Sequence, residues 1–62
     1  MIDNFTFENI VEHLEEHPSF DQLQFCREEL RALFLNGLPT QNYSDYLARL
    51  SHIRDSLLTD AA

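Results

Sequence analysis

The chain has 62 residues, with 11 acids against four arginines and no lysine, and its formal net charge is −7. A chain of this length forms one domain at most, here residues 1–62, and is near the lower size limit for burying a sufficient core alone. Cys26 is the only cysteine. A disulfide within the chain is therefore excluded, and we expect stability to come from helix packing, a metal or a partner.

The negative charge is concentrated in the first third of the chain. Residues 1–21 contain six acids and no Lys or Arg, whereas residues 22–62 contain five acids and four arginines. Such a field repels nucleic acid and acidic membranes and attracts basic partners. The sequence has neither the basic and apolar regions of a signal peptide nor an apolar run of about 20 residues that would cross a bilayer. We therefore expect a soluble, cytoplasmic protein.

A first helix is predicted over residues 7–17. Thr6 is a candidate N-cap, and Phe5 before it is placed to contact Ile10 as a hydrophobic staple. Pro18 ends the segment, because the residue before a proline avoids the helical region. The apolar residues follow the spacing of one buried helix face: Phe7, Ile10, Val11 and Leu14.

A second helix is predicted over residues 20–35. Ser19 and Gln22 have the spacing of a capping box. Gly37 suits the left-handed position after the helix, with Leu38 folding back on Leu33. The apolar stripe has the spacing 3, 4, 3: Leu23, Cys26, Leu30 and Leu33.

A third helix is predicted over residues 43–58, capped by Asn42 or Thr40. Its stripe continues the same spacing: Tyr43, Tyr46, Leu50, Ile53 and Leu57. Two successive helices with matching stripes and a short connection predict an antiparallel hairpin. The fold class is therefore all-α, a short N-terminal helix plus a helical hairpin. A monomeric three-helix bundle and a hairpin dimer both fit this pattern.

The stretch "HLEEH" at residues 13–17 matches a zinc-peptidase pattern with two histidine ligands and a glutamate base. His13 and His17 are one helical turn apart, but a catalytic zinc needs a third protein ligand. Pro18 also places His17 in the last turn of its helix, and His52 is expected on the outward face of the third helix. We interpret the histidines as boundary residues, and we predict no metal site, no catalytic residue and no cofactor.

Two surfaces are candidate partner sites. The acid-only segment predicts an acidic face on the first helix: Glu8, Glu12, Glu15 and Glu16. The second helix is apolar on more than one side, which is typical of a helix packed on two sides. Its second side predicts an apolar patch for a partner or a second copy of the chain: Phe25, Ala32 and Leu35.

The remaining polar and thiol groups have structural interpretations. Arg27 and Arg31 flank the stripe of the second helix, and Arg54 lies within the stripe of the third. All three are expected to pair with the acids of the first helix. Cys26 lies inside a stripe and is expected to be a small buried hydrophobe.

The second helix, the glycine-containing turn and the third helix also resemble a helix-turn-helix motif. In that motif Gln41, Asn42 and Ser44 would begin the recognition helix. However, the turn "NGLPTQN" is longer than the tight turn of the motif, and the sequence has no basic patch to neutralise phosphates.

In length, acidity and helical hairpin the chain resembles the small accessory proteins encoded in the early regions of lambdoid phages. The resemblance implies a bacterial host cell and action by binding a host or phage protein. We therefore expect a non-enzymatic regulatory module that modulates a basic or nucleic-acid-binding protein. We also expect that the module can form a homodimer. The alternative is a helix-turn-helix DNA-binding transcriptional regulator.

Overall fold

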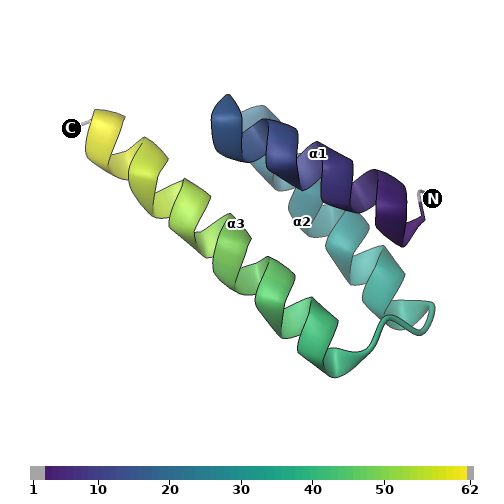
Figure 1. Ribbon diagram of the computed structural model, residues 1–62. Helices are drawn as coiled ribbons and strands as arrows, with labels where there is room; N and C mark the ends of the chain where they lie inside the picture. The colour runs from purple at the N-terminus through teal and green to yellow at the C-terminus, as the bar shows by residue number, and fades with distance from the viewer. Residues whose placement is uncertain (1–2, 62) are drawn as a thin grey trace.

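The computed structural model describes residues 3–61, and the side chains of residues 3–59. These residues form three helices and no strand: α1 (Asn4–Glu16), α2 (Phe20–Leu35) and α3 (Thr40–Ala61). Figure 1 shows α2 and α3 running antiparallel as a hairpin, with α1 lying beside α2. Because α1 packs against both other helices, the described residues form one three-helix bundle. The predicted all-α class and helical hairpin are confirmed.

The start of α1 differs from the prediction. Asp3, not Thr6, is the N-cap, and its carboxylate accepts a hydrogen bond from the Thr6 backbone N–H at 2.7 Å. The helix therefore begins at Asn4, and Phe5 is 77% exposed rather than stapled onto Ile10. Asp3 caps a helix that starts three residues earlier, because its carboxylate accepts from an N–H of the first turn that has no partner within the helix. The earlier start lengthens the helix and includes Asn4, which accepts a hydrogen bond from Tyr46 of α3.

The boundaries of α2 agree with the sequence, but only one of its two predicted caps is present. Ser19 is the N-cap without a side-chain cap bond, so the predicted capping box is wrong. At the other end Gly37 has a φ of 111°, and the Leu38 N–H donates to the Leu33 carbonyl at 3.0 Å. This six-to-one bond, with Gly37 N–H donating to the Phe34 carbonyl at 3.2 Å, is a Schellman motif. The predicted glycine stop is confirmed.

The third helix begins three residues earlier than predicted and continues to Ala61. The Tyr43 N–H donates to the carbonyl of Pro39 at 3.0 Å. Proline fits a helix start because its φ is already set near the helical value and the missing N–H is not needed there. The helix therefore starts at Thr40, one of the two predicted caps, and Asn42 lies inside it. The chain turns from Gly37 into α3 within three residues. Phe34 and Tyr43 stack at this end of the hairpin, with ring centroids 4.3 Å apart.

The core lies along the line where the three helices meet, and it contains the predicted stripes. Phe7 packs edge-on against Tyr46, with ring centroids 4.8 Å apart, and the Tyr46 hydroxyl donates to Asn4 Oδ1 at 3.0 Å. Those contacts attach α1 to α3. Within the part of the chain that the structure describes, no helix combines the length and apolar character needed to cross a membrane. The buried residues are Phe7, Val11, Leu14, Leu23, Cys26, Leu30, Leu33, Tyr46, Leu50 and Ile53.

Candidate functional site: an acidic side and an arginine-lined groove

The acidic side of α1 is joined to α3 by one arginine. Arg49 donates through Nη2 to Glu15 Oε1 and through Nη1 to Glu8 Oε2, both at 2.8 Å, and through Nε to Glu15 Oε2 at 3.2 Å. The planar guanidinium can thus bond Glu15 with two nitrogens while the third reaches Glu8. Glu8 and Glu15 are seven residues apart on α1, so the Arg49 guanidinium bonds two carboxylates that are nearly two helical turns apart. The predicted acidic face is in part a structural contact.

The groups at this contact shift one another's pKa values. The hydrogen bonds from Arg49 hold the pKa of the Glu15 carboxyl below its usual range, and the nearby His52 adds to the effect. The same bonds, first those with Glu15, raise the pKa of Arg49 further above its usual value. Burial, followed by the Glu8 carboxylate, raises the pKa of the Tyr46 hydroxyl. The contact is therefore built from ionised partners.

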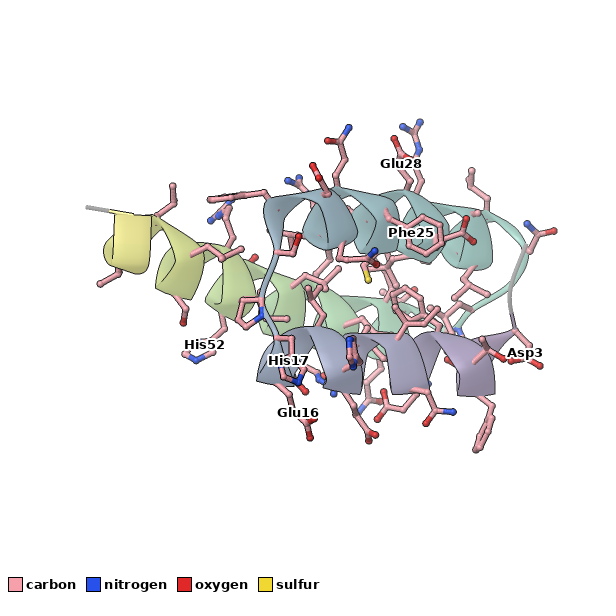
Figure 2. All side chains as sticks on the ribbon, turned by 90° about the horizontal axis from the view of Figure 1, so that it is seen from above. Asp3, Glu16, His17, Phe25, Glu28 and His52 are labelled. Atoms are coloured by element: carbon pink, nitrogen blue, oxygen red, sulfur yellow. The ribbon has the colours of Figure 1, made fainter. Side chains whose placement is uncertain are left out.

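Glu12 and Glu16 remain as the unpaired part of the acidic face. Both are exposed, and no ion pair involves either of them among residues 3–59. Glu16 and His17 mark the C-terminal end of α1 in Figure 2, away from the N-cap Asp3. The acidic face available to a partner is therefore narrower than the four predicted glutamates.

The Arg49 contact gives a stability prediction. Removing Arg49 and Glu15 singly and together, each to alanine, should reveal a coupling energy of about 0.5–1 kcal/mol, because the side chains are 29% and 40% exposed and water screens the pair. Urea unfolding of the four proteins measures it. About 1 M salt should reduce the coupling.

The same pair should respond to pH. The pKa of Glu15 is lowered in the folded chain, so its stabilisation is complete above the ordinary value of 4.5 and is lost as the pH falls through the folded value. The stability difference between wild type and Glu15→Gln should therefore shrink below about pH 4.5. A difference that grows on acidification would contradict the assigned contact.

The two histidines of "HLEEH" lie side by side without a metal-binding set. The ring centroids of His13 and His17 are 5.1 Å apart, and both rings line a hollow of about 350 Å³ with residues from α1 and Gln22 of α2. Among the described residues, no group of three or more His, Cys, Asp or Glu could hold a metal ion. His52 is exposed on α3, as expected, and Figure 2 shows it projecting away from the hairpin. The absence of a metal site and of a cofactor stays a prediction.

Cys26 is fully buried, as predicted. Burial raises the pKa of its thiol, and the charge of the neighbouring Glu29 raises it further. A thiol in this environment is held in its unreactive protonated form. Cys26 therefore fills core volume.

The predicted apolar patch lies largely on the surface. Phe25 is 41% exposed, Leu35 is 74% exposed and Ala32 is half-buried. Figure 2 shows Phe25 on the near side of α2. α1 therefore leaves part of this side of α2 open, and its role in dimerisation stays a prediction.

A second apolar surface lies in a groove between α2 and α3. The groove has a volume of about 620 Å³, and all of its lining residues come from these two helices. Phe20, Leu47 and Leu58 line it and are 49%, 36% and 54% exposed. Tyr43 lies at the turn end of the groove, so the apolar lining follows the hairpin along most of its length. We call this surface the hairpin groove.

Three of the four arginines line the hairpin groove: Arg27, Arg31 and Arg54. The prediction that these three pair with the acids of α1 is wrong, because Arg49 makes that contact instead. Arg54 lies 3.5 Å from Asp55 on its own helix, and no ion pair involves Arg27 or Arg31 within residues 3–59. Glu28 is the only acid in the lining, and Figure 2 shows it projecting from α2 on the side away from α1.

Sequence reasoning did not identify the hairpin groove, although a signal for it was present. Leu47 and Leu58 lie outside the main stripe of α3 by their spacing, and Arg54 lies between them. Phe20 and Arg27 have the corresponding positions on α2. These residues form a second stripe on each helix, both on the side that α1 leaves free.

Comparison of the chain with protein-family models, with curated proteins and with solved structures finds no match.

Proposed function

We propose that the chain is a small, non-enzymatic interaction module that binds a helical segment of another protein in the hairpin groove and thereby modulates that protein. The observation that carries the proposal is the row of exposed apolar side chains in the groove between the antiparallel helices α2 and α3. Exposed apolar surface of this kind marks binding sites, and a groove between helices accepts the apolar face of a third helix.

The chemistry of the lining supports binding rather than catalysis. The groove is lined by apolar residues, arginines, Gln24 and Glu28. Arginine, tyrosine and large apolar side chains are typical of the residues that dominate protein interfaces. The single cysteine, Cys26, is buried in the core, so it is not available to a ligand in the groove.

A pair of variants tests the proposal. Leu47→Glu places a charge in the groove, whereas Leu35→Glu places one in the predicted apolar patch of the same hairpin, outside the groove. Tagged wild-type chain is incubated with a bacterial lysate, and co-purifying proteins are identified by mass spectrometry. We expect at least one protein to be retained by wild type and Leu35→Glu and lost with Leu47→Glu, while circular dichroism shows all three folded. Retention by Leu47→Glu would contradict the proposal.

The acidic face is the alternative docking surface, for a basic or nucleic-acid-binding protein. Its available part is Glu12 and Glu16, because Glu8 and Glu15 bond Arg49. In the same lysate experiment, loss of a retained protein with Glu12→Gln plus Glu16→Gln, but not with Leu47→Glu, would assign binding to this face.

Self-association and DNA binding are separate proposals that stay open to direct tests. A dimer through Phe25 predicts that Phe25→Asp lowers the sedimentation mass of the chain. A DNA-binding regulator predicts a gel shift with duplex DNA. Figure 1 gives that alternative no support, because α2 and α3 lie side by side and do not cross steeply as the helices of the motif do.

A further inference from the structure

The hairpin groove carries a positive charge in a strongly negative chain. Arg27, Arg31 and Arg54 line it, against Glu28 alone. The chain has a net charge of −7 and only four arginines. The fourth arginine is bonded to α1, and Arg54 lies 3.5 Å from Asp55. The two arginines that no ion pair involves among the described residues, Arg27 and Arg31, therefore both line the groove.

The size of the groove defines the length of helix that it accepts. Tyr43 and Leu58 both line it and are 15 residues apart on α3. At about 1.5 Å per residue, this stretch is about 22 Å long. A partner helix of about four turns would therefore contact apolar side chains along its whole length.

A second copy of the chain fits this groove poorly. In a two-fold dimer the same surface meets itself, so the arginines of one groove would face the arginines of the other. In a head-to-tail arrangement the outer face of α1 would enter, and it offers Glu12 and Glu16. However, the only large apolar side chain that α1 exposes is Phe5, which leaves most of the apolar lining unmatched.

We propose that the hairpin groove selects an amphipathic helix that carries Asp or Glu along the edges of its apolar stripe. This inference rests on the proposed function and names the chemistry of the partner. The apolar stripe would cover Leu47 and Leu58 and supply affinity, while carboxylates would meet the guanidinium groups at the rim. Arginine suits that contact because its planar fork bonds a carboxylate through two nitrogens. Rim charges of this kind decide which partner is accepted and how fast it associates.

Three synthetic 18-residue peptides test the inference. They share one leucine stripe at helical spacing and differ only at the flanking positions, which are all Glu, all Gln or all Lys. Calorimetric titration into the wild-type chain at about 50 mM salt should give the tightest binding for the Glu peptide, at least about tenfold over the Lys peptide. The preference should shrink at about 500 mM salt, because the rim charges are screened.

The charge-reversed chain Arg27→Glu, Arg31→Glu, Arg54→Glu is the matched variant, and it should prefer the Lys peptide. Glu12→Gln plus Glu16→Gln, on α1, should leave the order of the three peptides unchanged.

Equal binding of all three peptides would overturn the charge selection and leave helix binding intact. Binding of none of them would overturn the inference, and the Leu47→Glu lysate comparison then decides separately whether the groove binds protein. Tighter binding of a short DNA duplex than of the Glu peptide would also overturn it.

Discussion

Replacing Phe7 with alanine is expected to remove about 3–5 kcal/mol from the free energy of unfolding. Phe7 is fully buried and packs edge-on against Tyr46, so the substitution opens a cavity at the junction of α1 and α3. A chain of 62 residues has about 3–9 kcal/mol of total stability. The variant should therefore be largely unfolded or melt tens of degrees lower, at about 4–8 °C per kcal/mol.

Phe5 provides the matched control for this experiment. It is the same residue type on the same helix, but its side chain is 77% exposed. Phe5→Ala should change the stability by no more than about 0.5 kcal/mol. Thermal and urea unfolding, followed by circular dichroism, measure both variants. Similar losses in the two would contradict the packing of α1 against the hairpin.

Replacing Leu30 with alanine is expected to destabilise the chain by about 2–5 kcal/mol. Leu30 is fully buried in the middle of α2, where the removed side chain leaves a cavity that rigid helices fill only in part. Leu35→Ala, on the last turn of the same helix, is the control, because Leu35 is 74% exposed. It should cost no more than about 0.5 kcal/mol. Urea midpoints compare the two, and a Leu35 effect as large as that of Leu30 would contradict the orientation of α2.

The core could be predicted from the sequence because helix geometry alone places the stripes. The spacing of Leu23, Cys26 and Leu30 puts these side chains on one face of α2 in any arrangement of the bundle. The Gly37 stop was equally local, since its left-handed φ and the bond from Leu38 to Leu33 depend on neighbouring residues only. Those features needed no knowledge of the other helices.

The arginine contacts could not be predicted in the same way. Arg49 and Arg54 flank opposite edges of the α3 stripe, and α1 can in principle pack on either side of a hairpin. The sequence pattern does not decide between these two arrangements. Once α1 lies on the Arg49 side, that residue meets Glu8 and Glu15, and Arg54 is left in the groove. The N-cap of α1 was also not predicted, because Asp3 and Thr6 are both good N-cap residues.

One side of the hairpin is covered by α1, and we propose that the other side is an open site for an acidic helix. Nuclear magnetic resonance locates the binding surface directly. The ¹⁵N-labelled chain is titrated with the Glu-flanked peptide, and changes in backbone amide shifts are mapped. We predict that the largest changes fall along the groove, around Phe20, Leu47 and Leu58. Largest changes around Glu12 and Glu16, or around Phe25 and Leu35, would contradict the claim.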